Sequence, residues 1–218
     1  MTSNQKRWVF RSAVLVACFA TLWFLPLFHI VPLDESDQKS MAAEAESFDP
    51  RAFVEKFWAE QLTPAATRST DAQTLVAAIE TEPEIAAETH GRRVGLSRGY
   101  YFFISGTGRV TRVDRNAIAL LLHEDAGDAQ VLLETGPIFG NAVRDGTGLL
   151  DINDFANSQD FNRISAEINQ RIEALVLPTL RENAKVGMAV RFVGCVEITD
   201  ETTDLRPLRV VPFIAEVQ

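Results

Sequence analysis

Gly136-Pro137-Ile138-Phe139-Gly140-Asn141-Ala142-Val143-Arg144-Asp145 is the stretch that decides how this chain folds. Before it, β-rich runs alternate with turn residues. After it, apolar residues recur at helical spacing, so the stretch joins strands to a long amphipathic helix. It combines turn glycines with an Arg/Asp pair and an amide, and Asp154-Phe155-Ala156-Asn157 follows before the helix begins. This connection is therefore central to both the topology and the candidate site.

Three strand segments are predicted before the connection and two after its helix. The first contains Gly106-Thr107-Gly108, where glycine allows a bend at a barrel corner. Pro178 is expected to kink the last turns of the helix. Three strands, a helix and two strands is the order of an OB-type barrel, whose helix plugs one end; an open α+β sandwich is the alternative. The first strand is predicted as two runs, residues 100–105 and 109–113, on either side of Gly106-Thr107-Gly108. The other predicted strands are 117–123, 130–134, 188–198 and 208–217, and the helix covers 161–176.

Two helices are predicted ahead of the strands. Asp49 can cap the first, with Pro50 at its first position. Thr70 and Gln73 form a capping-box pair for the second, which Pro83 ends or restarts. The predicted fold class is α+β: an N-terminal transmembrane helix, a helical lead-in and an OB-like five-stranded β-barrel with a long helix between strands 3 and 4. The predicted divisions are a cytoplasmic stub with its anchor (1–33), a linker (34–47), the lead-in (48–94) and the barrel (95–218).

The N-terminal segment predicts attachment to a membrane. In residues 12–33 the only strongly polar side chain is His29, and about 20 apolar residues suffice for a helix to cross a bilayer. Cations precede this run and acids follow it, which predicts a single-pass protein of the bacterial inner membrane with its C-terminal domain in the periplasm. Two alternatives are a lipoprotein cleaved before Cys18, since Leu15-Val16-Ala17-Cys18 has the form of a lipoprotein box, and a secreted protein with a cleaved signal peptide.

The charge of the exported part disfavours nucleic acid as a partner. The whole chain has a formal net charge of -9, and without the cations Lys6, Arg7 and Arg11 it reaches -12. Such an acidic domain repels phosphate backbones. The two cysteines, Cys18 in the apolar run and Cys195 near the C-terminus, are too far apart in the predicted arrangement to form a disulfide.

The connection offers a set of polar side chains that allows two interpretations. In the functional one, they line a small pocket at the barrel mouth and hydrogen-bond a sugar or a partner loop. In the structural one, which we favour, an Arg/Asp pair locks the turn and an Asp or Asn caps the helix. The candidate binding residues are Asn141, Arg144, Asp145, Asp154 and Asn157.

Signs of catalysis or of metal binding are missing from the sequence. It contains no Gly-x-Ser-x-Gly elbow, and its three histidines are scattered. Asp151-Ile152-Asn153-Asp154 lacks the glycine and closing glutamate of a calcium loop. Cys195 is expected to be a small buried thiol, and two of the four aromatic residues in 100–103 are expected to enter the core. We therefore predict no catalytic residue, no cofactor and no metal.

Several short motifs together resemble the DUF2291 family of predicted periplasmic lipoproteins. They are Ile30-Val31-Pro32-Leu33-Asp34, Phe48-Asp49-Pro50 with Phe57-Trp58, the stretch from Gly136 to Asp145, Asp154-Phe155-Ala156-Asn157, and Val186-Gly187 through Gly194. The resemblance implies an assistant of ribose-type sugar ABC transporters at the outer face of the membrane. Family members usually carry a lipid-bearing cysteine just before the first motif, where this chain has Phe28-His29; the departure favours a protein anchor.

The leading hypothesis is thus a membrane-anchored extracytoplasmic accessory protein of a sugar ABC transporter. Its expected partners are the inner membrane, the transporter's permease or sugar-binding protein, and the sugar itself. An envelope scaffold without small-ligand binding is the second hypothesis. A hydrolase of unknown type is the third, which the missing nucleophile, base and metal disfavour.

Overall fold

The computed structural model describes residues 48–95 and 99–218. Residues 48–218 form one compact unit. The predicted transmembrane helix and linker, residues 12–33 and 34–47, lie outside the described residues. Within the part of the chain that is described, no helix is long and apolar enough to cross a membrane.

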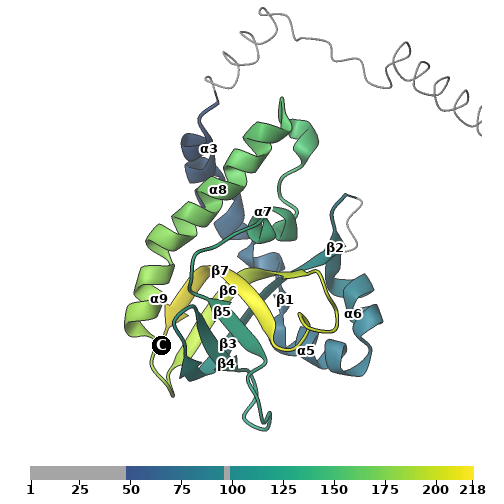
Figure 1. The fold of residues 1–218 in the computed structure, drawn as a ribbon, viewed down its shortest axis with the longest axis vertical. Helices are drawn as coiled ribbons and strands as arrows, with labels where there is room; N and C mark the ends of the chain where they lie inside the picture. Colours follow the sequence, from purple (N-terminus) through teal and green to yellow (C-terminus); the bar gives the residue numbers. More distant parts are fainter. Residues whose placement is uncertain (1–47, 96–98) are drawn as a thin grey trace, which may run out of the picture. The chain divides into compact units, whose positions relative to one another are not determined.

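The described residues form an α+β fold in which the predicted order of strands and helix is confirmed (Figure 1). The helices are α3 (Pro50–Phe57), α4 (Thr63–Ala65), α5 (Ala72–Thr81), α6 (Pro83–His90), α7 (Ala142–Thr147), α8 (Ser158–Leu175) and α9 (Leu177–Asn183). A π-helical turn η1 (Trp58–Leu62) and the 3-10 turns η2 (Ala66–Arg68) and η3 (Ile152–Asp154) accompany them. The strands are β1 (Thr70–Asp71), β2 (Gly91–Arg93), β3 (Tyr100–Val113), β4 (Ala117–Leu121), β5 (Val131–Glu134), β6 (Ala189–Ile198) and β7 (Leu208–Val217).

The sheet closes into a barrel. Its strands follow the order β3-β4-β5-β7-β6, and β6 pairs again with β3 along ten residues of each strand. The pair β5/β7 is parallel, while the other pairs of the barrel are antiparallel. Because β3 pairs with both β4 and β6, the open sandwich is excluded.

Strand β3 is continuous across its glycines. Gly108 lies so close to β4 that a Cβ there would stand 2.9 Å from the Cβ of Leu120, so glycine permits the close approach of the two strands without ending either. The prediction that two of the four aromatics face inward is confirmed. Tyr100 and Phe102 are 2% and 1% exposed and meet edge to face with ring centroids 5.3 Å apart.

The barrel interior holds the first of two hydrophobic clusters, and helices other than α8 contribute to it. Ala72, Leu75, Val76 and Ile79 of α5 join the inward residues of the strands, as do Leu180 of α9 and Ala184 just after that helix. Helix α5 lies at the barrel end formed by the β4–β5 and β6–β7 loops. Gln73 Nε2 donates to the Leu122 carbonyl at 2.8 Å, and Arg206 Nη2 donates to the Ile79 carbonyl at 3.3 Å.

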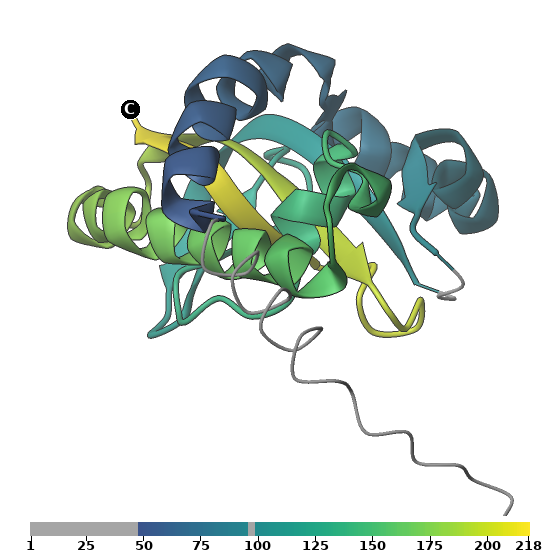
Figure 2. The same cartoon turned by 90° about the horizontal axis from the view of Figure 1, so that it is seen from above.

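The long helix α8 does not plug the barrel, contrary to expectation. Its apolar residues Ile164, Ile168 and Ile172 belong to a second cluster on the outer surface of the sheet, with Val54 and Phe57 of α3. Figures 1 and 2 show α3 and α8 side by side across β6 and β7. The outward residues of these strands, Val193, Cys195, Val211 and Phe213, complete this cluster. The amphipathic pattern therefore located the buried face of α8 but not the surface that it covers.

Three predictions about where helices begin, end or bend had different outcomes. Asp49 caps α3 as predicted, and its side chain accepts hydrogen bonds from the Arg51 and Ala52 amides. The predicted cap at Thr70 is wrong: Thr70 pairs with Ile104 of β3, and Asp71 caps α5 instead. The expected kink near Pro178 is a break, because α8 ends at Leu175 and α9 begins at Leu177.

Candidate functional site

The connection from β5 to α8 crosses the outer surface of the barrel beside β6. It turns at Gly140, forms the short helix α7, and turns again at Gly148. These two glycines have φ of 81° and 64°, in the left-handed region that glycine adopts without strain. The Gly140 turn brings the chain from Ile138 to Asn141 alongside α8, while α7 lies on the sheet.

Arg144 and Asp145 form a buried ion pair inside this connection. Arg144 Nε donates to Asp145 Oδ1 at 2.7 Å and Nη2 to Oδ2 at 3.0 Å, with the two residues 6% and 8% exposed. Arg144 Nη1 also donates to the Phe161 carbonyl at 3.1 Å and to Asn162 Oδ1 at 3.2 Å. The guanidinium lies 3.9 Å from the centroid of the Phe161 ring. Two of the five N–H groups of Arg144 thus bind Asp145 within α7, and two others hold α7 against the first turns of α8.

The other acidic and amide candidates of the connection take local roles. Asn157 caps α8: its Oδ1 accepts from the Asp160 amide at 2.8 Å, and its Nδ2 donates to Asp160 Oδ2 at 2.9 Å. Asp154 is exposed in η3, where its amide donates to the Asp151 carbonyl. The structure thus joins Arg144 directly to Asp145, while Asp154 and Asn157 make their own separate contacts.

Asn141 lines a groove between the Ile138–Asn141 segment and α8. The groove has a volume of about 500 Å³. Its α8 wall carries polar side chains three and four residues apart, which places them on one face of the helix. These are Asn162, Ser165, Asn169, Gln170 and Glu173, and opposite them lie Ile138, Phe139, Gly140 and Asn141.

Some polar groups of the groove hold it together. Asn169 Nδ2 donates to the Gly140 carbonyl at 3.0 Å, and Glu173 Oε1 accepts from the Ile138 amide at 2.6 Å. These bonds fix the loop to the helix, so the groove is formed without a ligand.

Other groups of the groove are uncommitted. The Ser165 side chain is buried, and its Oγ has no hydrogen-bond partner in the structure. Within the described residues the side chains of Asn141 and Gln170 make no hydrogen bond. The Phe139 ring is 83% exposed at the rim of the groove. Free amides beside an exposed aromatic ring can bind a ligand that is polar at its edge and apolar on its face.

A tyrosine and a glutamate lie next to this connection. Tyr101 of β3 donates its hydroxyl to Glu197 Oε1 at 3.2 Å. Burial raises the pKa of the Tyr101 hydroxyl, and the negative charges of Glu197 and Asp145 raise it further. Tyr101 therefore stays neutral at physiological pH, and its hydroxyl links β3 to β6 through Glu197.

Sequence reasoning missed the α8 wall of the groove. The candidate residues were chosen from the connection before the helix, whereas most of the groove's polar side chains come from α8 itself. The signal was present as amide, hydroxyl and carboxylate side chains at positions 162, 165, 169, 170 and 173, beside the apolar stripe of the same helix.

Within the described residues, neither a metal-binding cluster nor an accessible thiol is found. In that part of the chain, no cluster of three or more His, Cys, Asp or Glu is placed to hold a metal ion. Cys195 is fully buried as predicted, and burial raises the pKa of its thiol.

Comparisons with known proteins address the family and the fold. A family model described as "Predicted periplasmic lipoprotein (DUF2291)" matches residues 17–216. A solved OB-fold protein from Thermotoga maritima MSB8 is 24% identical to this chain, with a TM-score of 0.71, and the match covers 79% of this chain and 99% of that one. This likeness supports the predicted OB-like fold. A search of the curated proteins found no match.

Proposed function

Because this chain belongs to the DUF2291 family of predicted periplasmic lipoproteins, we propose that it is an extracytoplasmic accessory protein of a sugar ABC transporter. It acts by binding, without catalysis. Residues 12–33 anchor it in the inner membrane as an uncleaved helix, and the barrel unit works in the periplasm. The family description suggests a membrane-associated, extracytoplasmic location, which is compatible with this arrangement.

The groove along α8 is the proposed binding site, and a sugar is its proposed ligand. The observation that carries this is the pairing of free amides with an exposed aromatic ring. Asn141 and Gln170 each offer both a donor and an acceptor, as the hydroxyls of a sugar require. The Phe139 ring, 83% exposed, offers an apolar face to the C–H groups of a sugar ring.

Arg144 and Asp145 support this site from beneath. Their hydrogen bonds are directed to each other and to the first turns of α8, which leaves them little capacity for a ligand. We assign them the role of holding α7 and α8 together, and with them the polar wall that begins at Asn162.

Crosslinking in native membranes tests the accessory role. A photoreactive residue replacing Phe139 is expected to capture the transporter's permease or its sugar-binding protein. The matched control is the same replacement at Ile85, which is 55% exposed on α6 and lies outside the groove. Failure to recover any transporter component from Phe139 sinks the accessory role. Capture of the transporter without any sugar binding by the purified chain favours the scaffold alternative.

A further inference from the structure

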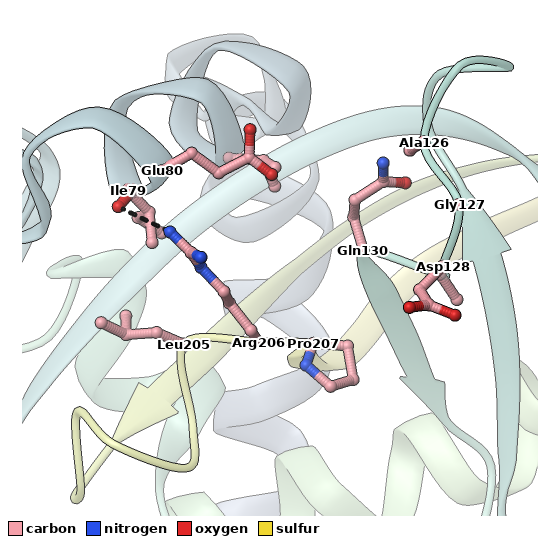
Figure 3. Close-up of a pocket in the computed structure, with 11 residues that line it drawn as sticks. Ile79, Glu80, Ala126, Gly127, Asp128, Gln130, Leu205, Arg206 and Pro207 are labelled. Atoms are coloured by element: carbon pink, nitrogen blue, oxygen red, sulfur yellow. Dashed lines mark hydrogen bonds between the residues drawn. The ribbon is translucent and has the colours of Figure 1, made fainter.

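A second cavity lies at the barrel end that α5 covers. It has a volume of about 470 Å³ and shares no residue with the groove along α8. Figure 3 shows its three walls: α5, the β4–β5 turn and the β6–β7 loop. The residues that line it are Val76, Ile79, Glu80, Ala126, Gly127, Asp128, Ala129, Gln130, Leu205, Arg206 and Pro207.

Apolar side chains form one part of the cavity wall. Val76, Ile79 and Leu205 are 8%, 2% and 9% exposed and border the barrel core, and Pro207 adds its ring beside them. A ligand in this cavity therefore meets a hydrocarbon surface, which favours an apolar body.

Two of the polar lining side chains are committed to the fold. Arg206 Nη2 donates to the Ile79 carbonyl at 3.3 Å, which satisfies one of the last backbone acceptors of α5. The Gln130 side chain accepts from the Leu122 amide at 2.8 Å. Figure 3 shows Arg206 directed toward α5 along the left of the cavity.

The two carboxylates are not committed. Glu80 stands on α5 and Asp128 on the opposite wall, and within the described residues neither makes a hydrogen bond or an ion pair. In Figure 3 they lie on either side of the cavity. The charged groups of the lining are these two carboxylates and the Arg206 guanidinium, whose bond to a neutral carbonyl leaves its charge without a counter-ion. The lining therefore has a net charge of -1 beside an apolar surface.

The loop that completes the cavity is held in place by its own hydrogen bonds. Asp204 Oδ2 accepts from the Thr199 and Asp200 amides at 2.9 and 2.8 Å. The Leu208 amide donates to the Gln130 carbonyl at 2.9 Å, which joins this loop to the β4–β5 turn. Because these bonds already order the walls, less conformational entropy is lost when a ligand binds.

We propose that this cavity is a binding site for a small organic cation with an apolar body. The apolar body packs on Val76, Ile79 and Leu205, and the cationic group lies between Glu80 and Asp128. The proposal is independent of the sugar site, because it concerns different residues on a different part of the barrel.

Calorimetric titration of the full chain in a non-ionic detergent tests the proposal. Phenethylamine serves as the cation, phenethyl alcohol as its neutral counterpart and phenylacetate as the anion. We expect saturable binding of phenethylamine, about three- to tenfold weaker binding of the alcohol, and weaker binding still of phenylacetate. Equal affinity for the amine and the alcohol, or no saturable binding of the amine, overturns the proposal.

Two double variants test whether phenethylamine binds in this cavity. E80Q/D128N is expected to weaken phenethylamine binding about three- to tenfold and to leave phenethyl alcohol unaffected. E84Q/D125N is the matched control, because it removes the same two charges from a neighbouring helix and the same turn, outside the cavity lining. All four substituted carboxylates are exposed, so both double variants should fold. An equal loss in both double variants shows a general charge effect and overturns the site.

Discussion

Arg144 and Asp145 are adjacent in the sequence, yet their side chains turn to meet each other through two hydrogen bonds of 2.7 and 3.0 Å. Both are buried beneath the connection between β5 and α8. A buried pair of this kind contributes little net stability over an apolar pair, but removing one member leaves the other charge without a partner.

The first prediction concerns this pair. Arg144→Ala should lower the free energy of unfolding by about 3–5 kcal/mol, because Asp145 is left buried and uncompensated. Arg112→Ala, which removes an exposed ion pair with Asp114, should cost less than about 1 kcal/mol. Urea denaturation of the detergent-solubilised chain measures both, and the double variant R144A/D145A should recover part of the loss. A change below about 1 kcal/mol for Arg144→Ala contradicts the assigned role.

Ser165 gives a prediction of opposite sign. Its buried hydroxyl has no partner, so Ser165→Ala removes an unsatisfied polar group and should raise the thermal midpoint of unfolding. Calorimetry or a dye-based melt measures the midpoint, with Ser158→Ala on the exposed first turn as the control. A lower midpoint for Ser165→Ala means that the hydroxyl makes a stabilising bond in solution and argues against a vacant hydrogen-bonding site.

The two tyrosines provide a spectroscopic prediction, because the chain has no others. Burial, helped by the charge of Glu201, raises the pKa of Tyr100 to about 12, and burial together with Glu197 raises the pKa of Tyr101. Folded protein should therefore show almost no phenolate absorbance at about pH 10.5, while unfolded protein titrates near 10. The neutral phenols are favoured in the fold, so this stability is complete below pH 10 and is lost as pH rises through the folded pKa values.

A variant separates the contributions to the tyrosine shift. Glu197→Gln should bring the Tyr101 transition closer to the unfolded value and leave that of Tyr100 in place. Ionisation of both tyrosines near pH 10 in the folded chain contradicts the burial described for them.

The anchor prediction concerns the N-terminus. We expect intact-mass spectrometry of the membrane-extracted chain to give about the full mass of 24.2 kDa. The segment between Arg11 and Cys18 is short for a signal-peptide core, and the apolar run continues well beyond the cysteine. The prediction is contradicted if the mature chain begins at Cys18 and carries acyl groups, because the anchor is then a lipid.

The sequence predicted the barrel better than it predicted the helices around it. Strand order followed from period-two patterns and turn residues, which are local signals. The position of α8 did not follow, because the spacing of Ile164, Ile168 and Ile172 predicts a buried face but not the elements against which it packs. Helix α8 packs against α3, more than a hundred residues earlier in the chain, and against the outer face of β6 and β7. Thr70 failed as a cap because tertiary pairing with β3 drew it into a strand.

The candidate site shows the same division between local and tertiary information. The structural interpretation of Arg144 and Asn157 followed from residue types typical of turn locks and helix caps. The groove itself requires the loop from Ile138 to Asn141 to lie along α8, and that contact depends on Asn169 and Glu173 far along the helix. Periodicity alone marks those two residues as one polar face of a helix.

Titration of the purified full chain with a panel of ribose-like pentoses and hexoses tests the central claim most directly. The account predicts saturable heat with at least one sugar. Phe139→Ala should weaken that binding about three- to tenfold, because it removes the exposed aromatic face. Ile85→Ala should bind like the unmodified chain. No saturable binding across the panel, or equal binding by Phe139→Ala, contradicts the assignment of the α8 groove as a sugar site.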